Sequence, residues 1–92
     1  GIIASKRCNN VDIYDNEVFD GGENAAGIFL HRSSDYARVY NNVIYNMKDA
    51  GIAMLESFNA EIYDNDIRGV KYGIRISLGG GDNYVHDNLF ED

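Results

Sequence analysis

A unit of about 23 residues occurs four times along this 92-residue chain, and this repetition restricts the fold more than any other feature. Glycine followed by isoleucine recurs at Gly1-Ile2, Gly27-Ile28, Gly51-Ile52 and Gly73-Ile74. An aromatic residue or histidine, then Asp or Asn, then Asn, ends at Asn16, Asn42, Asn65 and Asn88. The glycine precedes the asparagine by 15, 15, 14 and 15 residues. Two landmarks at a nearly fixed offset indicate four copies of one unit.

Apolar residues alternate within each unit with a period of two, which predicts strands rather than helices. In the first segment of a unit, Ile28 and Leu30 share a face, and Val11 and Ile13 do the same in a second segment. A third segment follows each asparagine, with an apolar residue two positions later: Val18, Ile44, Ile67 and Phe90. Each unit is therefore expected to hold three short strands separated by Gly, Asn, Asp and Ser turns.

Three short strands per unit predict an all-β fold, a right-handed parallel β-helix (solenoid) of about four coils with three short strands each. Coils spaced roughly 4.8 Å apart make a stack about 19 Å long. The repeat units are expected to be 1–26, 27–50, 51–72 and 73–92, forming a single β-helix fragment over 1–92. No capping segment is visible, so we expect the chain to be a piece of a longer solenoid.

Stacked coils place equivalent residues in columns with distinct expected roles. The isoleucines that follow the repeated glycines are expected to fill the interior. The repeated asparagines predict a turn ladder in which each side-chain amide bonds the next, and asparagine also tolerates the left-handed backbone that such a corner requires. The recurrence of Tyr14, Tyr40 and Tyr63 at one repeat position predicts a stacked structural ladder.

Composition excludes several classes of function. The net charge is −7, from 15 acidic and 8 basic residues, which argues against a nucleic-acid partner. No apolar run approaches the roughly 20 residues of a membrane span, so no membrane partner is expected. The lone Cys8 provides no disulfide framework. The sequence contains no HExxH or CxxC arrangement, so we predict no metal site and no cofactor.

The surface columns predict a basic strip on this acidic chain. Arg75 and His31 point outward by alternation, and Arg32 and Glu56 lie where the first strand of a unit is expected to end or bend. With Lys6, these residues form a band that suits an extended anionic polysaccharide. The alternative is that Arg32 and Glu56 merely pair across adjacent coils, which contributes under about 1 kcal/mol when exposed.

Four segments carry a resemblance to a known family over nearly all 92 residues. They are Gly1-Ile2-Ile3-Ala4-Ser5-Lys6-Arg7-Cys8, Gly27-Ile28-Phe29-Leu30-His31-Arg32, Leu55-Glu56-Ser57 and Gly73-Ile74-Arg75. This pattern resembles mannuronan C5-epimerases, β-helical enzymes that convert mannuronate to guluronate within alginate. The resemblance implies a partner that is an anionic polysaccharide (alginate or polymannuronate), an extracellular, cell-wall or periplasmic location, and a monomer.

The resemblance also implies site residues. The family's basic residue after the serine, which neutralises the substrate carboxylate and stabilises an enolate-like intermediate, falls on Lys6, with the adjacent Arg7 left open as the alternative. His31, Arg32, Glu56 and Arg75 would line outer subsites. The family's catalytic histidine lies in an Asp-Pro-His-Asp motif one coil earlier. The chain contains no proline, so we expect these 92 residues alone to be inactive.

Two other functions remain open from the sequence. A polyuronate (alginate or pectate) lyase on the same fold shares proton abstraction at C5 but then eliminates the 4-linked sugar. A non-catalytic β-helix module would bind glycan or act as a spacer. An Asp-Pro-His motif in the preceding coil would favour an enzyme over a module.

Overall fold

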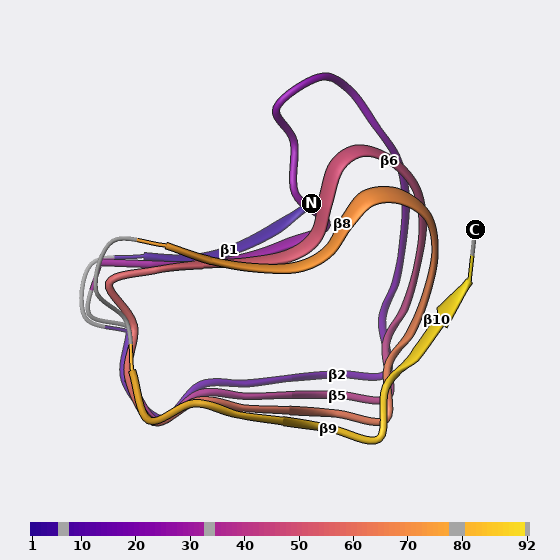
Figure 1. The fold of residues 1–92 in the computed structure, drawn as a ribbon. Coiled ribbons are helices and arrows are strands. Elements are labelled where there is room, and N and C mark those ends of the chain that lie inside the picture. Colours follow the sequence, from indigo (N-terminus) through magenta and orange to yellow (C-terminus); the bar gives the residue numbers. More distant parts are fainter. Residues whose placement is uncertain (6–7, 33–34, 78–80, 92) are drawn as a thin grey trace.

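The computed structural model describes residues 1–5, 8–32, 35–77 and 81–91, and these residues form parallel strands wound into four successive coils without a helix. The strands are β1 (Ile2–Ser5), β2 (Asp12–Tyr14), β3 (Glu17–Gly21), β4 (Ile28–His31), β5 (Arg38–Tyr40), β6 (Val43–Leu55), β7 (Glu61–Tyr63), β8 (Asp66–Ser77), β9 (Tyr84–His86) and β10 (Leu89–Glu91). Figure 1 looks along the stack, where equivalent strands of successive coils overlie one another. The predicted all-β solenoid of about four coils is confirmed.

Two parallel sheets make the walls. One has the order β2-β5-β7-β9, and the other has the order β1-β4-β6-β8-β10, with β3 beside β6. The second sheet differs from the three short strands expected per unit, because β6 and β8 span 13 and 12 residues and run around a corner. Pairing between them continues through that corner, with a register shift between Met47 and Ala50. The corner projects beyond the flat part of the sheet near β1 (Figure 1).

The core is built from the apolar columns that alternation predicts. Ile2, Ile28, Ile52 and Ile74 are register partners in consecutive strands. Ile28 and Ile52 are fully buried. The repeated glycine has a steric origin here: a Cβ on Gly27 would lie 2.6 Å from the carbonyl oxygen of Gly51 and 2.6 Å from a methyl carbon of Ile44. A side chain at this position would therefore collide with the next coil.

The predicted asparagine ladder is present, with one correction to its geometry. The Nδ2 of Asn42 donates to the Oδ1 of Asn65 at 2.9 Å, and equivalent bonds join the rungs above and below. The left-handed backbone, however, belongs to the residue before each rung: Asp15, Asn41, Asp64 and Asp87, with φ between 54° and 56°. The rung residues themselves do not have a positive φ, and their side-chain amides bond across the coils.

The overall dimensions agree with the coil count. The Cα extents are 29 × 25 × 18 Å, and the shortest is close to the length of about 19 Å expected for four stacked coils. In the part of the chain that the structure describes, no helix has the length and apolar character needed to cross a membrane.

Candidate functional site

Two residues of the basic strip predicted from the sequence, His31 and Arg75, lie on the outer face of β4 and of the second half of β8. Two outward columns follow the strand register: Ile3, Phe29, Ala53 and Arg75, and then Ser5, His31, Leu55 and Ser77. His31 lies in the second coil, where its Nδ1 is 3.4 Å from the Ser5 hydroxyl and its ring is 5.0 Å from that of Phe29. Arg75 lies two coils further along, on the same face.

Arg32 and Glu56 lie at the turns where β4 and β6 end, as the sequence predicted. Both have a left-handed backbone, with φ of 53°, and both side chains are exposed. Their amide N–H groups donate to carbonyls of the next coil, Leu55 at 2.9 Å and Ser77 at 3.3 Å. Neither side chain makes an ion pair with a described residue, so the simple pairing of Arg32 with Glu56 is not observed.

Lys6 and Arg7, the two candidates for the catalytic cation, lie outside the described residues. They follow Ser5, the last residue of β1, directly in the chain. Their role remains the one that the resemblance implies.

Arg75 makes the most substantial polar contact on this face. Its Nη1 lies 3.0 Å from each carboxylate oxygen of Asp49, which comes from the middle of β6. The side chain of Asp49 is 12% exposed and that of Arg75 is 41% exposed. The carboxylate of Asp49 is thus mostly buried, while the guanidinium of Arg75 keeps N–H donors available to solvent.

Further cations surround this pair. A hollow of about 340 Å³ beside it is lined by Glu23, Asn24, Lys48, Asp49 and Lys71. The exposed ring of Tyr72 has the Lys71 ammonium 5.4 Å from its centroid and the Arg75 guanidinium carbon 5.9 Å from it, within the range of cation–π attraction. We call Lys48, Asp49, Lys71, Tyr72 and Arg75 the Asp49–Arg75 site.

The sequence reasoning identified Arg75 but missed the other four residues of this site. The sequence did hold an indication that these residues lie close together, because Asp49 and Lys71 each stand two positions before a repeated glycine. That stretch was expected to be a turn, whereas it is strand that continues around the corner. The arrangement can bind an anion, because the cations Lys48, Lys71 and Arg75 outnumber the two carboxylates beside them, Asp49 and Glu23, on an otherwise acidic chain.

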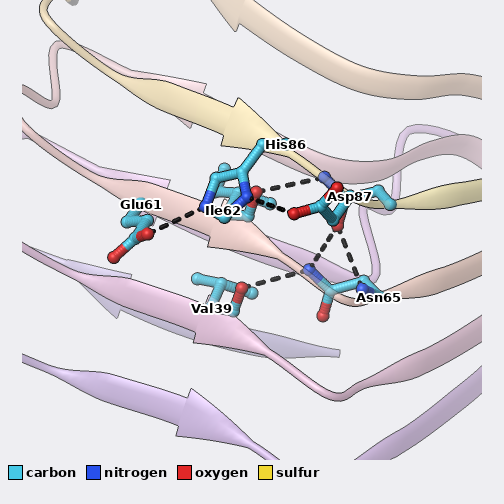
Figure 2. A network of polar contacts seen from close by, with 7 residues as sticks. Val39, Glu61, Ile62, Asn65, His86 and Asp87 are labelled. Atoms are coloured by element: carbon cyan, nitrogen blue, oxygen red, sulfur yellow. Dashed lines mark hydrogen bonds and ion pairs between the residues drawn. The ribbon is translucent and has the colours of Figure 1, made fainter.

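The opposite sheet carries the predicted tyrosine ladder. Tyr14, Tyr40 and Tyr63 stack at centroid spacings of 5.1 and 5.0 Å, and His86 extends the stack at 5.2 Å from Tyr63. Both ring nitrogens of His86 lie 2.8 Å from carboxylates, Nδ1 from Asp87 and Nε2 from Glu61 (Figure 2). Hydrogen bonds to Asp87 and then to Glu61 raise the pKa of His86 above its ordinary value.

Charge pairing also occurs on the same face in the first two coils, between β2 and β5. Arg38 donates to both oxygens of the Asp12 carboxylate, at 3.0 and 2.9 Å. This hydrogen bonding lowers the pKa of Asp12 and raises that of Arg38. The polar groups of this face are therefore paired with one another, which marks a structural ladder. Within the described residues, no group of three His, Cys, Asp or Glu side chains is placed to hold a metal ion.

The stacked parallel coils, the inward isoleucine column and the asparagine ladder define a β-solenoid. The chain belongs to the right-handed β-helix family, whose model, described as "Right handed beta helix region", matches residues 1–90. No curated protein and no solved structure matches the chain. The fold is consistent with a carbohydrate-active or carbohydrate-binding module.

Proposed function

We propose that this chain holds an anionic polysaccharide on the outer face of β1, β4, β6 and β8, as part of a mannuronan C5-epimerase. The observation that carries the proposal is the Asp49–Arg75 site, which gathers Lys48, Lys71 and Arg75 on a chain of net charge −7. Guanidinium and ammonium groups bind carboxylates through charge-assisted hydrogen bonds. A polyuronate presents one carboxylate on each sugar unit.

The geometry of the solenoid suits a polymer. Adjacent coils repeat every ~4.8 Å, which is close to the length of one sugar unit, so a glycan chain lying along the stack meets successive coils in register. His31 lies two coils from Arg75 on the same face. A short oligosaccharide along the stack would therefore contact both residues.

The proposed reaction breaks the C5–H bond of a mannuronate unit. A base takes the proton, the electron pair moves into the adjacent carboxylate to give an enolate-like intermediate, and a proton returns to the other face of C5. Lys6 or Arg7 is proposed to stabilise the negative charge that develops on the carboxylate. The resemblance in the segment Gly1 to Cys8 supports this assignment.

Binding is tested with hexamannuronate and the 92-residue chain by isothermal titration calorimetry. We expect Arg75→Gln to weaken binding at least tenfold. Arg38→Gln is the matched control, since it removes the same charge from the tyrosine face. An equal effect of both substitutions, or no effect of either, would contradict the proposed binding face.

The reaction is tested with the full-length natural protein and polymannuronate. New guluronate signals in the NMR spectrum, without an ultraviolet absorbance increase from unsaturated uronate, are expected for an epimerase. An absorbance increase would identify a lyase instead. Binding without either change would identify a non-catalytic module.

A further inference from the structure

A second polar ladder runs from β3 to β6, and it stops before β8 in the third coil. Asp20, Asn46 and Gly69 occupy equivalent positions in three coils, with φ of 57°, 56° and 59°. The Nδ2 of Asn46 donates to the Oδ1 of Asp20 at 2.6 Å. Gly69 has no side chain to make the next rung, and no described residue donates to the Oδ1 of Asn46. The ladder therefore ends at Asn46, whose side chain is exposed.

A hollow of about 520 Å³ occupies this part of the surface and is lined by Glu17, Tyr45, Asn46, Arg68 and Gly69. Its volume falls within the range of small-molecule sites. A Cβ on Gly69 would find Asn46 N at 3.5 Å, an ordinary contact, so the hollow persists because Gly69 lacks a side chain and not because a neighbour excludes one.

The groups around the hollow combine acceptors, a donor and an apolar ring. Glu17 and Asn46 supply acceptor oxygens, and Arg68, whose side chain is 46% exposed, supplies guanidinium donors. Tyr45 stacks on Phe19 with a centroid spacing of 5.2 Å, and its hydroxyl lies 3.3 Å from a Glu17 carboxylate oxygen. The guanidinium carbon of Arg68 is 6.0 Å from the Tyr45 centroid. Both faces of the ring are occupied, so a ligand meets its edge and its hydroxyl.

The charge balance selects the type of ligand. Arg68 is already paired with Asp66 at 3.2 Å, and Asp20 lies at the foot of the ladder. With Glu17, these groups leave the surroundings of the hollow negative, which disfavours a carboxylated sugar. Hydroxyl groups that both donate and accept hydrogen bonds match the mixture of acceptors and donors.

We propose that this hollow binds a neutral pyranose unit of a glycan. The site lies on β3 and the first halves of β6 and β8, whereas Arg75 lies on the second half of β8. A chain with both sites would hold a neutral glycan beside an anionic one.

Amide chemical shifts of the ¹⁵N-labelled chain test this site, with mannotetraose and cellotetraose as neutral probes and tetramannuronate as the charged one. We expect the neutral probes to shift the amides of Asn46, Arg68 and Gly69, and tetramannuronate to leave them unchanged. Absence of shifts at millimolar neutral probe would overturn the proposal. Shifts confined to the Asp49–Arg75 site, or tighter binding of tetramannuronate in the hollow, would also overturn it.

Gly69→Asn is the decisive variant, since asparagine tolerates a positive φ and its side chain completes the ladder. We expect at least tenfold weaker binding of mannotetraose with an otherwise native amide spectrum. Asp64→Asn is the matched control, because it places asparagine at another exposed left-handed corner, with φ of 54°. Native affinity in Gly69→Asn, or the same loss in Asp64→Asn, would rule the hollow out. Tyr45→Phe removes only the hydroxyl and is expected to weaken binding about threefold.

Discussion

The Oδ1 of Asn65 accepts two hydrogen bonds from Asn42, one from its backbone N–H at 3.0 Å and one from its side-chain amide at 2.9 Å. Both residues are 1% exposed. The Nδ2 of Asn65 in turn donates to the carbonyl of Val39 at 3.0 Å and to the Oδ1 of Asn88 at 2.9 Å (Figure 2). Each rung thus satisfies buried polar groups of the coils on both sides, and the coils are joined by side chains as well as by strand pairing.

Removing one inner rung is expected to destabilise the whole stack. Asn65→Ala leaves the backbone N–H and one side-chain N–H of Asn42 buried without an acceptor, while the Nδ2 of Asn42 keeps its bond to the carbonyl of Ile13. Each unsatisfied group costs roughly 1–3 kcal/mol. We expect a loss of about 3 kcal/mol or more in the free energy of unfolding, measured by urea denaturation. Asn41→Asp changes an exposed neighbour and serves as the control. Equal midpoints for the two variants would contradict the ladder's energetic role.

The alternation of isoleucines allows a second matched comparison. Ile52 is fully buried and points into the solenoid, whereas Ile3 is 67% exposed on the outer face. We expect Ile52→Ala to lower the free energy of unfolding by about 2–5 kcal/mol, because it removes buried methyl groups and leaves a cavity. Ile3→Ala is expected to change it by less than about 0.5 kcal/mol. Similar losses in both variants would mean that the strand faces are assigned wrongly.

Repetition explains which features could be predicted from the sequence. Ile28 and Asn42 belong to columns that recur in every unit, because the same interior and the same corner recur in every coil. The tyrosine ladder was predicted for the same reason. The backbone of the corner was not, since a recurring Asp-Asn pair does not reveal which of the two residues adopts the left-handed conformation. The structure assigns it to the first, Asp64, and not to Asn65.

Residues without a counterpart in other coils were harder to predict. Asp49 meets Arg75 only because β6 continues around the corner instead of ending before Gly51. Asp49 has no carboxylate at the equivalent position of the other coils, so the repeat pattern does not indicate where its side chain points. The hollow beside Gly69 arises in the same way, from a rung that is missing in one coil. Ladders follow from repetition, whereas candidate binding sites arise where repetition fails.

Stability is expected to depend on the ionisation of His86. The charged groups that contact the imidazole of His86 are the carboxylates of Glu61, from β7, and of Asp87. The rings of Tyr63 and Tyr84 pack against it. The pKa of His86 is raised above 6.5 by hydrogen bonds to Asp87 and Glu61. The protonated form is therefore favoured by folding. Its contribution is complete below about pH 6.5 and is lost as the pH rises through the raised pKa.

Urea midpoints between pH 5.5 and 8.5 measure this dependence, with His31→Asn as the background so that only His86 titrates among the histidines. We expect the midpoint to fall with rising pH in that window. His86→Tyr, which continues the tyrosine ladder without an ionisable imidazole, is expected to remove the slope. A slope that persists in His86→Tyr, or a midpoint that rises with pH in the background variant, would contradict the assignment.

Removing the carboxylate of the Asp49–Arg75 site is expected to strengthen its affinity for polyuronate. Asp49 occupies donors of Arg75 and repels a ligand carboxylate, whereas Asp49→Asn leaves the Arg75 side chain, 41% exposed in the native chain, without its anionic partner. We expect hexamannuronate to bind about three- to tenfold more tightly, equivalent to roughly 0.7–1.4 kcal/mol, in calorimetric titrations. Asp12→Asn is the matched control, because it releases Arg38 with the same change in net charge on the other sheet. Weaker binding in Asp49→Asn would mean that Asp49 positions Arg75 for the ligand. Equal strengthening in both variants would mean that only the net charge matters.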